Sequence, residues 1–114
     1  MTGDNDLPVR WENLTSKLTS RFGKKPDMEA ILFLIGIQEL GSSQTSFTKE
    51  QKQDLMHVAV CSLFKLSGYY TIESYDQERW PHFRQLKALP EMTASEQEDF
   101  MKDHILLYFS QHDF

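Results

Sequence analysis

The stretch Ala30–Ile37 reads Ala-Ile-Leu-Phe-Leu-Ile-Gly-Ile, a nearly unbroken apolar run in an otherwise polar chain of 114 residues. A helix that crosses a bilayer needs about 20 apolar residues, so this run is too short to be one. A helix that is apolar on every side is buried on every side. The run therefore predicts a central helix, with Phe33 and Ile35 both almost fully buried although they lie on different sides of it.

Residues on both sides of the run bound this helix. Pro26 and Asp27 precede it and Gly41 follows it, which matches the preference for proline at helix starts and glycine just beyond helix ends. The helix is thus predicted from about residue 27 to residue 40. Gly36 inside it costs about 1 kcal/mol relative to alanine. A glycine at this position indicates that a neighbouring backbone or ring approaches the helix closely.

Two further helices begin at capping boxes, in which a threonine is followed three residues later by glutamine or glutamate. The boxes are Thr48–Gln51 and Thr93–Glu96. They predict helices that run to about residue 66 and about residue 110. A fourth helix, over residues 8–22, follows from one apolar stripe at helical spacing, which consists of Trp11, Leu14, Leu18 and Phe22.

The helix that starts at Thr48 has two different faces on a helical wheel. Its apolar face consists of Leu55, Met56, Ala59, Val60, Leu63, Phe64 and Leu66. Its polar face consists of Glu50, Asp54, His57, Cys61 and Lys65. In the last helix the predicted apolar face consists of Phe100, Met101, Ile105, Leu107 and Tyr108, with His104 inside it.

Residues 69–90 favour a short, irregular β-hairpin. Tyr69–Ile72 has the composition of a strand, residues 76–79 form a polar turn, and Trp80–Leu86 fits a returning strand. A short helix with Pro81 in its first turn is the alternative. The fold class is thus mainly α, a four-helix domain with a central apolar helix and the hairpin between the third and fourth helices. Residues 1–114 form a single domain in this interpretation, with residues 1–7 flexible.

The net charge of −5 is unevenly distributed along the chain. Residues 1–26 carry a net charge of +2, whereas residues 91–114 carry −5. The acidic end disfavours binding to a phosphate backbone. The basic segment can pair with it in the same chain or in a partner chain; the alternative is that the two segments are solvated helix faces. A single cysteine and the lack of a visible signal peptide predict a cytoplasmic location without a membrane span.

Five aromatic residues within fifteen positions form the most distinctive candidate surface. They are Tyr69, Tyr70, Tyr75, Trp80 and Phe83. Aromatic side chains with polar tips are enriched at recognition surfaces. The cluster therefore suggests an interaction surface, most simply between two copies of the chain; the alternative is that the rings cover the open end of the helix bundle.

Two sets of titratable residues offer other chemistry. His104, beside Tyr108 on an apolar helix face, suggests a pocket in which the imidazole binds a ligand or acts as a base; the alternative is a core histidine bonded to a carbonyl. His57 and Cys61 have a spacing that would let them share a metal ion. A structural zinc site needs four such ligands and the chain has one cysteine, so no metal and no cofactor are predicted.

Three segments together resemble a group of small uncharacterised proteins of Bacteroidetes. The segments are Ile31–Gly41, Lys52–His57 and Trp80–His82, and the resemblance covers about residues 27–110. It is consistent with a cytoplasmic bacterial protein and implies no substrate, cofactor or catalytic residue.

The sequence contains no recognisable catalytic motif, so the leading hypothesis is a non-enzymatic protein-interaction module that acts as a homodimer. The main alternative is a small ligand-binding protein or enzyme with a pocket near His104, to which His57, Cys61 or His82 contribute. A third hypothesis is a winged-helix-like DNA binder with the hairpin as its wing. The acidic charge argues against that hypothesis.

Overall fold

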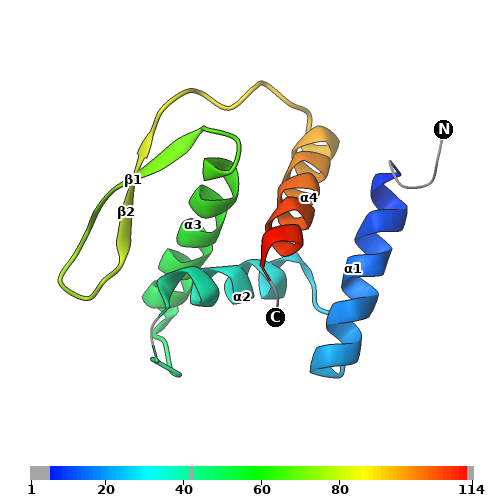
Figure 1. Ribbon diagram of the computed structural model, residues 1–114, viewed down its shortest axis with the longest axis horizontal. Coiled ribbons are helices and arrows are strands. Elements are labelled where there is room, and N and C mark those ends of the chain that lie inside the picture. The colour runs from blue at the N-terminus through cyan, green and yellow to red at the C-terminus, as the bar shows by residue number, and fades with distance from the viewer. Residues whose placement is uncertain (1–5, 42, 113–114) are drawn as a thin grey trace. The chain divides into compact units, whose positions relative to one another are not determined.

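A computed structural model describes residues 6–41 and 43–112 of the chain. The elements in order are α1 (Leu7–Phe22), α2 (Met28–Leu40), α3 (Lys49–Lys65), β1 (Tyr70–Tyr75), β2 (Pro81–Gln85) and α4 (Ala94–Gln111). The prediction of a mainly α fold, with a hairpin between its third and fourth helices, is confirmed (Figure 1). Of the segment 1–7 predicted to be flexible, residues 1–5 lie outside the described residues. Asp6 occupies the N-cap position of α1, without a side-chain capping bond, and Leu7 begins the helix.

The chain packs as two compact units. Residues 27–89, with α2, α3 and the hairpin, form one unit, and α1 and α4 belong to the other. The four helices therefore pair as α2 with α3 and α1 with α4, and a single four-helix domain stays a prediction.

Both predicted capping boxes are present. The Thr48 hydroxyl accepts a hydrogen bond from the Gln51 backbone N–H, and the Gln51 side chain accepts one from the Thr48 N–H, at 3.1 and 3.0 Å. Thr93 and Glu96 repeat this arrangement at 3.2 and 2.9 Å. Each box satisfies two N–H groups that the first turn of a helix leaves without a partner, so it fixes the residue at which the helix begins.

The pair α2 and α3 is held by an unusually close backbone approach at Gly36. An ideal Cβ atom on Gly36 would lie 2.4 Å from the carbonyl oxygen of Leu55. Figure 1 shows α2 crossing α3 near the start of α3. Around this crossing Ile31, Ile35 and Leu55 are fully buried. The close approach that the sequence predicted at Gly36 is thus confirmed.

The prediction that α2 is buried on every side is wrong for Phe33. Ile35 is fully buried, but Phe33 is only half-buried, as are Leu34 and Ile37. Phe33 borders an open hollow between α2 and α3, where it meets the edge of the Phe47 ring at a centroid distance of 6.0 Å.

The face assignment of α3 is wrong for Cys61. The helical wheel puts this residue on the polar face, yet it is buried, as are Val58 and Ser62. The buried arc of α3 is therefore wider than its apolar stripe, because the helix packs against both α2 and β1.

The hairpin is a two-stranded antiparallel sheet with one irregularity. Tyr70 faces Gln85 and Ile72 faces Phe83, whereas beyond the irregularity Ser74 faces His82 and Tyr75 faces Pro81. The extra residue is Glu73, so β1 contains a bulge there. The bulge changes which side chains of β1 share a face with those of β2.

The other unit pairs α1 with α4, which run in the same direction (Figure 1). Arg10 and Asp103 form an ion pair at 3.3 Å, so the basic segment and the acidic end do meet within one chain. Leu14, Leu18, Ile105 and Tyr108 are buried, as the helical stripes predict. Phe22 and Leu107, at the margins of those stripes, are instead exposed.

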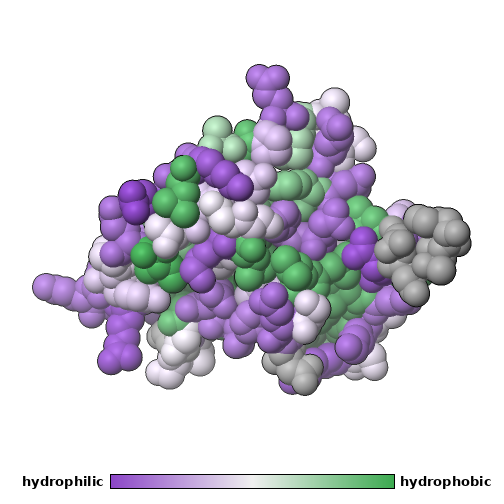
Figure 2. All heavy atoms as spheres, turned by 45° about the horizontal axis from the view of Figure 1, so that its top comes forward, coloured by the Kyte–Doolittle hydropathy of each residue, from purple (hydrophilic) through white to green (hydrophobic). Residues whose placement is uncertain are grey.

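Several large apolar side chains lie at the surface. Among residues 6–41 and 43–112, the exposed large apolar side chains are those of Val9, Phe22, Tyr75, Leu86 and Leu107. On the face seen in Figure 2, hydrophobic side chains lie in several places among hydrophilic ones. No helix in the described part of the chain has the length and apolar character needed to cross a membrane.

Candidate functional site

The five aromatic residues of the predicted interaction surface all lie on or beside the hairpin, but they are not equally exposed. Tyr75, at the end of β1, is 63% exposed. Tyr69, Tyr70, Trp80 and Phe83 are half-buried. Tyr75 is therefore the member of this set that is most accessible to a partner.

Tyr69 anchors the hairpin to the end of α3. Its ring meets the Phe64 ring edge-on at a centroid distance of 6.4 Å, and the Lys87 ammonium lies 4.5 Å from the Tyr69 ring centroid. The backbone carbonyl of Tyr69 also accepts a hydrogen bond of 2.8 Å from the Leu86 N–H. Tyr69 thus contributes to packing within the chain.

The turn between the strands is organised by one carboxylate. Asp76 Oδ1 accepts hydrogen bonds of 2.9 Å from the backbone N–H groups of Glu78 and Trp80. Asp76 Oδ2 lies 3.2 Å from His82 Nε2. Arg79 closes the turn with a φ of 70°, a left-handed conformation that is uncommon for a residue other than glycine.

These hydrogen bonds lower the pKa of Asp76 below its usual 3.8. The Trp80 backbone N–H is the main cause, and the His82 side chain and the Glu78 N–H act in the same direction. Asp76 is therefore a carboxylate across the physiological pH range, and its side chain fixes the backbone position of Trp80.

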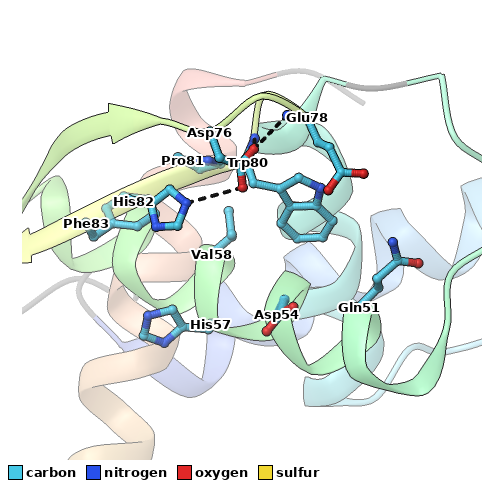
Figure 3. A pocket seen from close by; sticks show the side chains of 10 residues that line it. All are labelled: Gln51, Asp54, His57, Val58, Asp76, Glu78, Trp80, Pro81, His82 and Phe83. Carbon is cyan, nitrogen blue, oxygen red and sulfur yellow. Dashed lines mark hydrogen bonds and ion pairs between the residues drawn. The ribbon is translucent and has the colours of Figure 1, made fainter.

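A hollow of about 340 Å³ lies between the turn end of the hairpin and α3 (Figure 3). Residues from α3 form one side of it, and the turn and β2 form the other. Its lining consists of Gln51, Asp54, His57, Val58, Asp76, Glu78, Trp80, Pro81, His82 and Phe83. In Figure 3 the Trp80 indole extends from the hairpin toward α3, and Asp54, Gln51 and Glu78 lie around it.

The lining of this hollow is acidic. It contains three carboxylates, two histidines and no lysine or arginine. Asp76 uses its oxygens within the turn, whereas Asp54 and Glu78 form no side-chain hydrogen bond or ion pair in the described part of the chain. An acidic hollow with an indole ring can accept a cationic group, because a ring face and carboxylates both attract positive charge.

The same hollow brings together two of the histidines that the sequence suggested as contributors to a pocket, but away from His104. His57 comes from α3 and His82 from β2, and both are exposed. No group of three or more His, Cys, Asp and Glu side chains within residues 6–41 and 43–112 is placed to hold a metal ion. The two histidines can act as hydrogen-bond donors or acceptors toward a ligand.

Cys61 lies beneath His57 on α3 and is inaccessible. Its Sγ atom is 3.6 Å from His57 Nε2, and the residue is 1% exposed. Burial raises the pKa of the Cys61 thiol from 9.0 to about 11. A neutral, buried thiol is a poor nucleophile and a poor metal ligand. The position of Cys61 therefore fits a structural role in the core and not a reactive or metal-binding one.

His104 and Tyr108 lie in the unit formed by α1 and α4. His104 is buried, with its Nδ1 atom 2.7 Å from the Phe100 carbonyl oxygen, and its ring packs on the Phe100 ring at 4.5 Å. Tyr108 is 1% exposed and stacks on the His112 ring at 4.1 Å. The carbonyl bond is the arrangement that the core-histidine interpretation describes.

Two other hollows differ in character from the first. One, of about 480 Å³ between α2 and α3, includes Ala30, Phe33 and Met56 together with residues of both charges. The other, of about 330 Å³, includes Leu18 and Phe109 of the α1–α4 unit. Neither of these hollows, nor the one beside the hairpin, is lined by His104 or Tyr108.

Sequence reasoning placed Trp80 and Phe83 in a candidate surface but did not assign Asp54, Asp76 or Glu78 to a site. For Asp76 the sequence did contain a signal, because it starts a polar turn. An aspartate in that place commonly accepts hydrogen bonds from backbone N–H groups two residues ahead. The pairing of that turn with Asp54 depends on how the hairpin packs on α3, which no local pattern encodes.

No protein-family model matches the chain, and neither a curated protein nor a solved structure matches it.

Proposed function

We propose that this chain is a non-enzymatic protein-interaction module that self-associates as a homodimer through its hairpin. The observation that carries the proposal is the exposure of Tyr75, 63%, at the end of β1. Burying a water-exposed aromatic side chain against a partner is energetically favourable. Tyrosine is also enriched among the residues that dominate interface energies.

The hairpin is also suited to contact through side chains. Within the described residues it is a sheet of only two strands, so the outer edge of each strand faces no further strand. Pro81 removes a backbone donor from β2, and the bulge at Glu73 interrupts β1. Both features discourage the addition of another strand at these edges, so the proposed contact uses the side chains of Tyr75 and its neighbours.

Sedimentation equilibrium of the full chain tests the proposal. The expected result is a dimer mass at tens of micromolar, roughly the range in which modest interfaces are populated. Tyr75→Ser should shift the protein toward monomer. Val9→Ser is the matched control, because it also removes an exposed apolar side chain but lies on α1. A monomer mass for the wild type contradicts the proposal. So does a dimer that is equally tight in the Tyr75→Ser and Val9→Ser variants.

A second candidate function is binding of a small ligand, favoured by the convergence of His57, His82 and Trp80 on one hollow. This is the ligand-binding alternative drawn from the sequence, moved from His104 to the hairpin. The hollow beside the hairpin has a volume of about 340 Å³, which lies within the range of small-molecule sites, roughly 300–1,000 Å³. A screen of small amines and amino acids by ligand-observed NMR tests it, and saturable binding that Trp80→Leu abolishes is the expected result.

A further inference from the structure

We infer that the hollow between the hairpin and α3 binds an arginine side chain of a partner protein. The inference rests on the protein-interaction part of the proposed function, and it names the chemistry of a contact separate from the self-association through Tyr75. It starts from a concave site of about 340 Å³ in which an aromatic ring and unpaired carboxylates occur together.

The indole of Trp80 provides the surface on which a planar cation can stack. The turn fixes the position of this residue, because the Trp80 N–H is bonded to Asp76 Oδ1 at 2.9 Å and the Trp80 carbonyl accepts from the Asp76 N–H at 3.0 Å. Trp80 is only half-buried, and its ring extends into the hollow in Figure 3. An indole carried on a fixed backbone costs less to order when a ligand stacks on it than one carried on a mobile loop.

Asp54 and Glu78 provide the negative charge. They come from α3 and from the turn, so they lie on the two sides of the hollow, and the described residues offer neither of them an ion-pair partner. Asp76 adds a third negative charge although its oxygens are engaged in the turn. With no lysine or arginine in the lining, the charge of the hollow is complementary to a cation that comes from outside it.

Arginine fits this combination better than lysine does. A guanidinium group is planar, stacks on aromatic faces and donates hydrogen bonds in a fork that matches a carboxylate. An ammonium group is a compact, strongly hydrated charge that uses the ring less well. An anionic or phosphate-bearing ligand is disfavoured by the same carboxylates.

Amide NMR of the full chain during titration with a short capped peptide, Gly-Arg-Gly, tests the inference. We expect saturable shifts at the Trp80 indole N–H and at amides of residues 54–58 and 76–83. The same peptide with citrulline keeps the shape of arginine and removes its charge, so it should bind about tenfold or more weakly. A lysine peptide should bind more weakly than the arginine peptide.

Variants locate the site. Asp54→Asn with Glu78→Gln should weaken arginine-peptide binding about tenfold or more, since both partners of the cation lose their charge. Both side chains are exposed and free of ion pairs, so the fold should remain intact. Glu50→Gln is the matched control, because it removes an exposed carboxylate from the same helix outside the hollow, and it should leave binding unchanged.

Several outcomes would overturn the inference. They are equal binding of the arginine and citrulline peptides, equal binding of the arginine and lysine peptides, no saturable shift, or a loss with Glu50→Gln as large as that with the double variant. Sedimentation of the double variant separates this inference from the proposed function. A double variant that still dimerises while its peptide binding is lost supports both claims, whereas a wild-type monomer that still binds the arginine peptide overturns only self-association.

Discussion

Gly36 and Leu55 meet at a distance that excludes any side chain between them: a Cβ atom on Gly36 would lie 2.4 Å from the Leu55 carbonyl oxygen and 3.1 Å from the Leu55 Cβ atom. The backbone oxygen of a helix cannot move aside without moving the helix. This single relationship therefore sets how closely α2 crosses α3.

Gly36→Ala should destabilise the protein by about 2 kcal/mol, which is typical of overpacking in a core. The sign of the effect is informative, because replacing glycine by alanine at an unobstructed helix position would stabilise the helix by up to about 1 kcal/mol. Urea unfolding followed by circular dichroism measures the change. Gln38→Ala, at an exposed position of the same helix, should be close to neutral. A Gly36→Ala variant as stable as wild type would contradict the close crossing.

Thr48→Ala and Thr93→Ala should each reduce the free energy of unfolding by about 1 kcal/mol, since each variant leaves a first-turn N–H without its partner. Thermal and urea unfolding provide the measurement. Thr45→Ala, an exposed threonine in the loop before α3, is the control and should have little effect. If the control costs as much as the two cap variants, the capping boxes do not define these helix starts.

The buried thiol of Cys61 should make the protein less stable at high pH. Burial raises its pKa from 9.0 to about 11, so the folded chain keeps a proton that the unfolded chain releases between these values. The free energy of unfolding should therefore fall as the pH rises from about 9 toward 11. Cys61→Ala removes this contribution, so the difference in stability between wild type and variant should change over that interval. A constant difference from pH 8 to about 11 would show that the thiol titrates alike in both states.

The lowered pKa of Asp76 should make the free energy of unfolding depend on pH in the opposite sense at acidic pH. Its pKa is lowered below 3.8, so its contribution to stability is present above that pH and is lost as the pH falls through the lowered value. Carboxyl carbon shifts in an NMR titration should give a midpoint below 3.8. Because the Trp80 backbone is the larger cause, His82→Gln should leave the midpoint lowered. A midpoint at or above 3.8 in wild type would contradict the turn geometry.

Much of the fold could be predicted because local chemistry determines it. Capping boxes, an aspartate at the start of α2 and glycines beyond two helix ends are signals that involve residues within one turn of each other. Burial was harder to predict. Phe33 and Cys61 were assigned wrongly because apolar composition shows which residues favour the interior, whereas the packing partner decides which of them reach it.

The candidate site could be predicted only in part. The aromatic content of residues 69–83 indicated the hairpin, but four of its five aromatic residues are half-buried. Of these, Tyr69 packs on α3, and Trp80 and Phe83 line the hollow. Asp54 and Glu78 line one hollow because the hairpin packs on α3. The two residues lie more than twenty positions apart in the sequence, so no local spacing predicts that they meet.

The most direct test of the central claim, that the hairpin is the interaction surface, is the concentration dependence of the amide NMR spectrum of the full chain. Residues at a self-association interface change environment on dilution, whereas the others do not. We predict that the amides that shift lie within residues 69–86, with Tyr75 among the largest changes. Shifts confined to residues outside this segment, or a spectrum that dilution leaves unchanged, would contradict the claim.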